Sequence, residues 1–144
     1  MLVTEINQYS VEKSISISLI FHTSQISAGF PSPVDDYKEN SLSIDQYLIQ
    51  HPEATYFVKV SGDSMTGAGI FGGDILVVDR MADATHNKII IAELNNEFTV
   101  KRLYKKNGVI KLTAENKEYP DIIMADESQL NVWGVVVGCI KKFS

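Results

Sequence analysis

The chain has 144 residues, 44% of them hydrophobic, and a formal net charge of −5. This length suits one domain with a hydrophobic core, and two domains would be crowded. The acidic balance argues against a nucleic-acid-binding surface, because such surfaces need clustered basic side chains to neutralise phosphates. The basic cluster of the sequence is short (Lys101, Arg102, Lys105 and Lys106), so we expect any link to DNA to run through a protein partner.

Residues 1–40 differ in character from the rest of the chain. Ser14–Leu19 alternates polar and apolar residues with period two, as a strand with one buried face would. The two prolines within Phe30–Pro33 favour extended or polyproline backbone and exclude a helix there. We therefore predict a mostly extended N-terminal arm over residues 1–40 and a folded domain over residues 41–144.

A short helix is predicted from Ser43 to Gln50. Ser43 and Gln46 have the spacing of a capping box, in which the serine hydroxyl satisfies a free backbone N–H group at the helix start. Ile44, Tyr47 and Leu48 would share one face of this helix.

The remainder of the chain is predicted to be β structure. Six stretches are rich in Val, Ile, Phe and Tyr, namely Thr55–Val60, Asp74–Asp79, Lys88–Leu94, Glu97–Leu103, Val109–Ala114 and Leu130–Lys141. The pairs Asn95-Asn96 and Asn107-Gly108 suit hairpin turns, because Asn and Gly tolerate a positive φ. The expected fold is a mostly β, curved and mainly antiparallel sheet with one short helix.

Cofactor, membrane and secretion signals are weak. His22, His51 and His86 share no metal-ligand spacing, so we expect neither a metal site nor a cofactor. The start of the chain does not resemble a secretory signal, and no run approaches the ~18 apolar residues of a membrane span. A single cysteine, Cys139, fits a reducing compartment, and its apolar surroundings at 135–140 predict that it is buried. We expect a soluble, cytoplasmic protein.

Ser64 is the first candidate for chemistry. It lies in Ser61–Met65, which leaves an apolar strand and enters a glycine-rich stretch. A serine placed there could present both its hydroxyl and its backbone N–H to a bound carbonyl group. The alternative is a surface loop in which Ser64 only satisfies local backbone groups.

Lys101 is the candidate base, since a serine hydroxyl is a poor nucleophile until a base takes its proton. It lies 37 positions after Ser64, and alternation places Phe98 and Val100 on one strand face and Lys101 on the other. If that second face is open to water, Lys101 stays charged and cannot act. If it is covered, desolvation can lower a lysine pKa by ~3–5 units.

The dipeptide Ala28-Gly29 is the candidate cleavage site. Its small side chains would let the backbone enter a narrow protease site, although the same residues also suit an ordinary flexible arm.

Together these segments resemble the LexA/UmuD family of self-cleaving Ser–Lys peptidases. The resemblance is carried by Ala28–Pro33, Phe57–Met65 with Gly69-Ile70 and Gly73-Asp74, and Phe98–Arg102. Ala28–Pro33 and Gln50–Pro52 are similar to UmuD-type mutagenesis proteins rather than to repressors. The resemblance covers roughly residues 28–144, while residues 1–27 match no motif of this family.

The resemblance implies a role for each candidate. Ser64 would attack the carbonyl of Ala28, and a neutral, buried Lys101 would take the serine proton and pass it to the leaving amine of Gly29. The backbone N–H groups of Ser64 and Met65 would form the oxyanion hole.

The resemblance also implies partners. Such proteins are homodimers whose cleavage is stimulated by a RecA–ssDNA filament. The product would serve as an accessory subunit of a UmuC-type error-prone translesion DNA polymerase in the SOS response.

Three other interpretations stay open at this point. A LexA-like repressor would need a helix-turn-helix domain ahead of the cleavage site, and the sequence before Gly29 does not have a helical pattern. A signal-peptidase-like enzyme would need a membrane anchor. A non-catalytic polymerase-binding module would keep the fold without the reaction.

Overall fold

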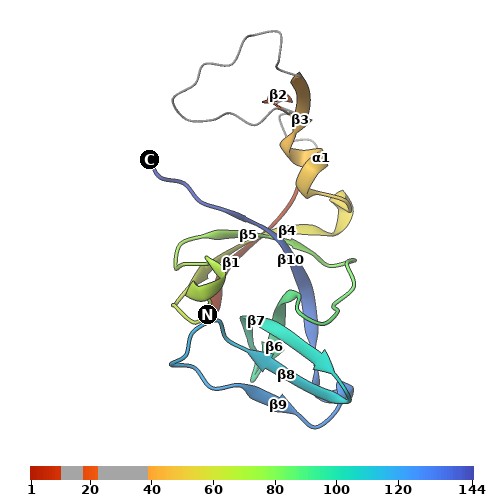
Figure 1. Ribbon diagram of the computed structural model, residues 1–144, viewed down its shortest axis with the longest axis vertical. Helices are drawn as coiled ribbons and strands as arrows, with labels where there is room; N and C mark the ends of the chain where they lie inside the picture. The colour runs from red at the N-terminus through yellow and green to blue at the C-terminus, as the bar shows by residue number, and fades with distance from the viewer. Residues whose placement is uncertain (11–17, 23–38) are drawn as a thin grey trace. The chain divides into compact units, whose positions relative to one another are not determined.

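The computed structural model describes residues 1–10, 18–22 and 39–144, which fall into two compact units (Figure 1). One unit contains Met1–Tyr9 and His51–Ser144, and the other contains Ser10–Gln50. The predicted cleavage dipeptide, Ala28-Gly29, lies outside the described residues, as does Phe30–Pro33. No described helix is long and apolar enough to cross a membrane.

The smaller unit contains a two-stranded sheet and a short helix. Strand β2 (Ser18–His22) pairs antiparallel with β3 (Glu39–Ser43), and helix α1 (Ile44–Leu48) follows directly. Ser43 is the N-cap of α1, and its Oγ accepts a hydrogen bond from the Gln46 N–H at 3.5 Å. The capping residue predicted for this helix is confirmed, and the helix ends at Leu48 because the backbone of Ile49 is extended.

The larger unit is built around an eight-stranded antiparallel sheet with the order β1-β4-β5-β10-β6-β7-β8-β9. The predicted mostly β, antiparallel fold is confirmed. The strands are β1 (Leu2–Gln8), β4 (Thr55–Ser61), β5 (Ile75–Asp79), β6 (Ile89–Leu94), β7 (Glu97–Lys106), β8 (Val109–Thr113), β9 (Ile122–Met124) and β10 (Val132–Ile140). Short 3₁₀ turns occupy Pro52–Ala54, Thr66–Ala68 and Glu127–Gln129.

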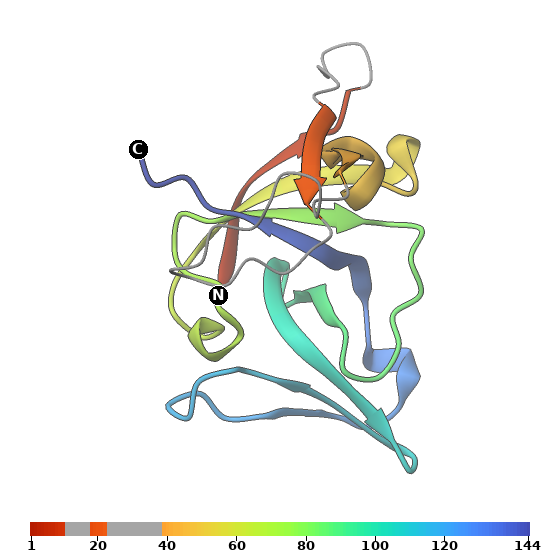
Figure 2. The ribbon, with the colours of Figure 1, turned by 45° about the horizontal axis from the view of Figure 1, so that its top comes forward.

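Strand β1 closes part of this sheet into a ring. It pairs antiparallel with β4 along most of its length, and Leu2 also pairs with Thr99 of β7. Strand β1 therefore connects β7 with β4 within the sheet. Figure 2 shows the red N-terminal strand running beside β4, with its first residue close to β7. Nothing in the sequence indicated that residues 1–8 would join the sheet of the folded domain.

The predicted hairpin turns are confirmed. Asn95, Asn96 and Asn107 have φ values of 52°, 64° and 54°, and Gly108 has 75°. Two consecutive positive φ values are what a tight two-residue hairpin requires. These turns set the registers of β6 with β7 and of β7 with β8, and so place Lys101 opposite Ile90.

The interior holds two hydrophobic clusters, one under β1, β4 and β5 and one under β6, β7 and β8. The first includes Met1, Val58, Met65, Leu76 and Val100, and the second includes Ile90, Leu103, Ile110 and Leu112. Each fully buried aliphatic side chain of this kind stabilises a fold by about 1.5–3 kcal/mol. Ser64 and Lys101, the candidate catalytic residues, lie where the first cluster meets β7.

The predicted burial of Cys139 is wrong. Its side chain is exposed near the end of β10. Strand β10 pairs with β6 only as far as Val135 and continues beyond that residue with β5 as its partner. The apolar run at 135–140 is therefore covered along only part of its length.

Candidate functional site

Ser64 is held in a tight turn that follows β4. Gly62 has a φ of 98°, a conformation that residues with a side chain rarely adopt, and it turns the chain directly after the strand. Met65 is fully buried in the first core cluster and anchors the far side of the turn. Ser64 itself has no solvent exposure, so its hydroxyl points into the molecule.

Lys101 lies in the middle of β7 and is buried, with 7% of its surface exposed. Both faces of the strand are covered here, since Val100 on one face and Leu103 on the other are completely buried. Desolvation lowers the pKa of the Lys101 ammonium, because burial disfavours the charged form. Within the described residues Lys101 has no salt bridge to a carboxylate that would oppose this shift.

The fold brings these two residues together. Lys101 Nζ donates a hydrogen bond to Ser64 Oγ at 3.3 Å, although 37 positions separate them in the sequence. When the lysine amine is neutral, the same distance allows the Ser64 hydroxyl to donate to Lys101 Nζ instead. This is the arrangement that a general base needs. The histidines whose side chains are described lie elsewhere, with His51 Nδ1 at Asp79 and His86 Nδ1 accepting from the Lys105 N–H.

A second amine contacts the same hydroxyl. The α-amino group of Met1 donates to Ser64 Oγ at 2.6 Å. Burial lowers the pKa of this amine, and the positive charge of Lys101 lowers it further, while Asp63 acts in the opposite direction. The hydroxyl oxygen thus accepts from two amines at once, which uses both of its lone pairs. This contact was not expected from the sequence.

A loop after β8 braces the Ser64 turn. The Glu115 N–H donates to the carbonyl of Ser64 at 2.9 Å, and the Gly67 N–H donates to the carbonyl of Glu115 at 2.7 Å. A side chain at Gly67 would meet that carbonyl oxygen at 2.6 Å, so only glycine fits this contact. The carboxylate of Glu115 also pairs with Arg102, the residue after Lys101. One residue therefore connects the serine turn to the lysine strand.

Asp63 is held by the same loop. Its carboxylate accepts from the Tyr119 hydroxyl, and its carbonyl accepts from Asn116 Nδ2 at 2.9 Å. The hydrogen bond to Asp63 raises the pKa of Tyr119, whose ring lies 5.4 Å from Lys101 Nζ. Spacing offered no signal for these contacts, because residues 115–119 carry no motif of their own.

The backbone N–H groups of Ser64 and Met65 were predicted to form an oxyanion hole. No hydrogen bond from either N–H to another described residue is found, while Thr66 N–H donates to Asp63 at 3.4 Å. Both donors are thus left available beside the serine hydroxyl. Their role in an oxyanion hole stays a prediction.

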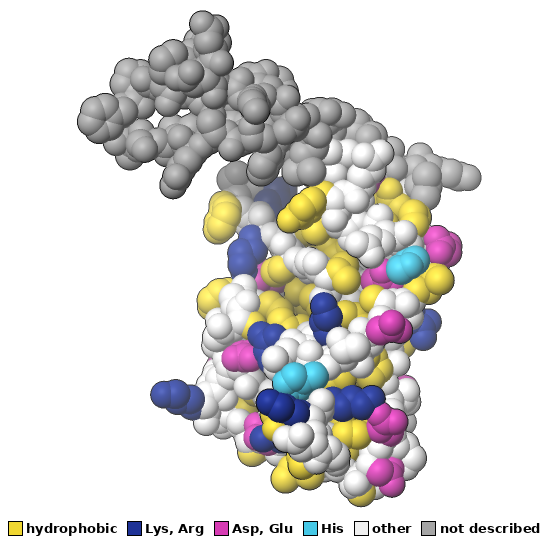
Figure 3. All heavy atoms as spheres, turned by 45° about the vertical axis from the view of Figure 1, so that its right-hand side comes forward, with side chains coloured by type: hydrophobic (Ala, Val, Ile, Leu, Met, Phe, Trp, Pro, Cys, Tyr) yellow, Lys and Arg dark blue, Asp and Glu magenta, His cyan; other side chains and the backbone are white. Residues whose placement is uncertain are grey.

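The basic cluster of the sequence does not form a continuous basic surface. Lys101 is buried, Arg102 pairs with Glu115, and Lys105 pairs with Glu127. On the face seen in Figure 3, basic side chains lie among acidic and hydrophobic ones.

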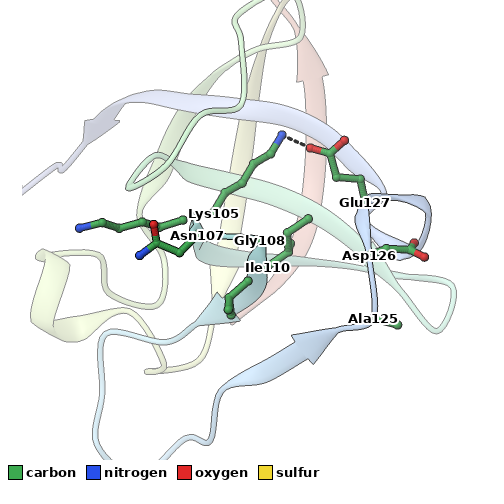
Figure 4. A pocket seen from close by; sticks show the side chains of 9 residues that line it. Lys105, Asn107, Gly108, Ile110, Ala125, Asp126 and Glu127 are labelled. Atoms are coloured by element: carbon green, nitrogen blue, oxygen red, sulfur yellow. Dashed lines mark ion pairs between the residues drawn. The ribbon is translucent and has the colours of Figure 1, made fainter.

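Two surface pockets lie near these elements. One of about 330 Å³ is formed by the β7–β8 turn and the segment after β9, and Figure 4 shows the Lys105–Glu127 pair at its edge. Neither Ser64 nor Lys101 lines it. A second, of about 450 Å³, is lined by Gly67 and the bracing loop, including Glu115 and Tyr119. Within the described ranges, no group of three or more His, Cys, Asp or Glu side chains is arranged to hold a metal ion.

The structure thus combines a mostly antiparallel sheet with a buried contact between a serine hydroxyl and a lysine amine. The Peptidase S24-like family matches residues 19–137, and the chain belongs to this family of peptidases. The resemblance to the UmuD-type branch of the LexA/UmuD proteins is thereby confirmed.

Curated relatives agree with this assignment. The chain is 45% identical to Protein MucA of Salmonella typhimurium over 120 residues, which are 83% of this chain and 82% of MucA. It is 42% identical to Protein SamA of Salmonella typhimurium over 120 residues, 83% of each chain. It is also 38% identical to the LexA repressor of Bordetella pertussis over 118 residues, which are 81% of this chain but 54% of the repressor.

Proposed function

We propose that this protein is a self-cleaving serine endopeptidase that cuts its own Ala28–Gly29 bond. Ser64 is the nucleophile and Lys101 is the general base. The observation that carries this proposal is the 3.3 Å contact between Ser64 Oγ and Lys101 Nζ in a site closed to solvent. Membership of the peptidase family supports it independently.

The reaction proceeds in two stages. Ser64 Oγ attacks the carbonyl carbon of Ala28 while its proton moves to the neutral amine of Lys101, and the N–H groups of Ser64 and Met65 stabilise the oxyanion. The intermediate collapses as Lys101 returns the proton to the departing nitrogen of Gly29. The ester that joins Ala28 to Ser64 is then hydrolysed by water, with Lys101 again taking a proton.

Burial makes Lys101 suitable for this role. A lysine in water keeps its proton at neutral pH, since its ordinary pKa is ~10.4. Desolvation lowers the pKa of Lys101 and raises the fraction of neutral amine. A base whose pKa is closer to the working pH transfers protons more effectively.

The wider role proposed is that of a UmuD-type protein in SOS mutagenesis, acting in the cytoplasm as a homodimer. A RecA–ssDNA filament would stimulate cleavage by favouring the conformation with the arm in the site. If that conformation is populated at only ~1%, the reaction is slowed about a hundredfold, and a few kcal/mol of differential binding removes the delay. The product Gly29–Ser144 would then join a UmuC-type translesion polymerase.

Incubation of the purified protein at about pH 10, with and without activated RecA filament, tests the proposal. At this pH a substantial fraction of lysine is already neutral at its ordinary pKa of ~10.4, and burial of Lys101 raises that fraction. We expect two fragments, one ending at Ala28 and one beginning at Gly29, identified by mass spectrometry and terminal sequencing. No fragments under either condition would contradict the enzyme and favour a non-catalytic binding module.

Two variants serve as matched controls. Ser64→Ala should abolish the fragments while leaving the circular dichroism spectrum unchanged. Gly29→Lys should block processing, because a long charged side chain should not fit beside the bond. Normal cleavage of the Gly29 variant would mean that the scissile bond lies elsewhere.

A further inference from the structure

Strand β1 occupies the gap between the two strands that carry the site. Leu2 pairs with Ser61 at the end of β4 and with Thr99 of β7. The carbonyl of Met1 accepts from the Val100 N–H at 3.0 Å and from Thr99 Oγ1 at 2.9 Å. The backbone positions next to Lys101 and just before Ser64 are therefore bonded to the first residues of the chain.

The same segment covers the serine. Met1 contacts Ser64 Oγ through its α-amino group, and Ser64 is fully inaccessible. The Cα of Met1 lies 3.4 Å from the position that a side chain at Gly62 would take, so Met1 sits directly on the serine turn. In this arrangement no substrate carbonyl reaches the hydroxyl.

The edge of β4 offers no alternative place for a peptide. Extended peptides bind proteins by adding a strand to an exposed sheet edge. One edge of β4 is paired with β5 and the other with β1. A peptide that approaches Ser64 along β4 therefore has to displace one of these two strands.

Strand β1 is the more weakly held of the two. From Leu2 to Gln8, every side chain except the half-buried Val3 is exposed. In β5 the side chains of Leu76, Val77 and Val78 are completely buried. The register of β1 with β4 also breaks between Val3 and Glu5. Displacing β1 uncovers little apolar surface beyond Met1, whereas displacing β5 would open the core.

This strand also lies outside residues 19–137, the part of the chain that matches the peptidase family.

We infer that β1 is a displaceable strand that occupies the substrate groove of the resting peptidase, and that the segment carrying the scissile bond takes its place before cleavage. The inference rests on the proposed function of Ser64 and Lys101. Displacement frees the lone pair of Ser64 Oγ that accepts from Met1, and it frees the N–H of Val100 for the incoming peptide. The observed rate is then the intrinsic rate multiplied by the fraction of molecules with β1 displaced.

Deletion of residues 1–9 tests the inference directly. Without β1 the groove is open, and self-cleavage at neutral pH without any activator should become at least about tenfold faster, as expected if fewer than about one molecule in ten has the strand displaced. Circular dichroism and thermal unfolding check that the shortened chain is folded. A folded deletion variant that cuts at the parent rate or more slowly would overturn the inference.

A reversible lock provides a second test that does not depend on the deletion. Glu5 and Lys59 face each other across β1 and β4, and both side chains are exposed. In a Cys139→Ser background, Glu5→Cys with Lys59→Cys should form a disulfide that prevents displacement. The oxidised protein should not cleave at pH 10, and reduction should restore cleavage. The two single cysteine variants are matched controls, and cleavage by the oxidised pair at the reduced rate would refute the inference.

Peptide binding separates this inference from the proposed function. In a Ser64→Ala background, a labelled peptide of residues 22–36 should bind the reduced lock variant at least about tenfold more tightly than the oxidised one, as measured by fluorescence anisotropy. If no variant cleaves but this difference is found, the proposed catalysis fails and the displaceable strand stands. Equal binding to both forms overturns the strand exchange, whatever the cleavage assay gives.

Discussion

Strands β7 and β1 meet at the same serine, yet they are held in different ways. β7 has partners on both sides, and around Lys101 both of its faces are buried. β1 exposes nearly all its side chains and depends on backbone pairing and on Met1. The strand that carries the proposed base is therefore part of the rigid core, while the strand that covers the nucleophile is the part most easily removed. A catalytic base has to be held in a fixed position, whereas the strand that covers the nucleophile has to be displaced before a substrate can reach it.

The largest expected effect comes from removing the amine of β7. Lys101→Met keeps the length of the side chain without its charge, and we expect self-cleavage to fall by at least about a hundredfold, since a positioned base contributes roughly 10²–10⁴. Lys106→Met, at the exposed end of the same strand, is the matched control and should leave the rate unchanged. Cleavage by Lys101→Met at the parent rate would mean that another group is the base.

The same substitution should stabilise the fold at neutral pH. The pKa of Lys101 is lower in the folded state than in the unfolded chain, so the unfolded state binds more protons and the buried lysine opposes folding below both pKa values. A difference of one pKa unit between the folded and unfolded states changes the free energy of unfolding by about 1.4 kcal/mol. Urea unfolding should show a gain for Lys101→Met at pH 7 that shrinks as the pH rises toward ~10.4.

The next largest effect is the dependence of the rate on pH. Below the pKa of Lys101 the neutral fraction grows about tenfold per pH unit, so cleavage should rise about a hundredfold over two units and then level off. Because burial lowers this pKa, the plateau should begin below the value of free lysine. A midpoint at or above ~10.4 would indicate that Lys101 is solvated when it reacts.

Hydrogen exchange compares the two strands within one molecule. The Val100 N–H donates to the carbonyl of Met1, the residue before β1, whereas the Leu103 N–H in the same strand donates to the carbonyl of Lys88 at 2.8 Å. If β1 opens locally, the Val100 amide should exchange at least about tenfold faster than the Leu103 amide under native conditions. Equal protection of the two amides would mean that β1 opens only with the whole sheet.

The smallest effect concerns the connection between the serine turn and β7. Arg102→Gln breaks the ion pair with Glu115 and should slow cleavage only several-fold, because partly exposed pairs contribute roughly 1 kcal/mol or less. A positioning role predicts that the pH midpoint of the reaction stays unchanged and that Arg102→Lys restores part of the rate. A shifted midpoint would show that Arg102 acts on the charge of Lys101 instead.

Much of the fold could be predicted because local patterns determine it. Alternation of apolar residues located the strands from β4 to β8 and β10, the asparagine pairs located two hairpins, and Ser43 located the start of α1. The short β9 lacked a comparable pattern and was missed, and β7 proved longer than predicted because it continues to the hairpin turn. The motif around Ser64 and the lysine of β7 both stand out in the sequence, although the sequence does not show that they touch.

The sequence by itself therefore determined which segments of the folded domain form most of its strands, where two hairpins turn, and which serine and lysine carry the family pattern. Only the tertiary structure decided that Lys101 is buried, because alternation assigns a residue to a face of a strand but does not say whether that face is covered. The same holds for Met1 at Ser64 and for Glu115 between the serine turn and Arg102. Contacts between residues far apart in the chain depend on how the sheet closes, and closure is a property of the packed strands together.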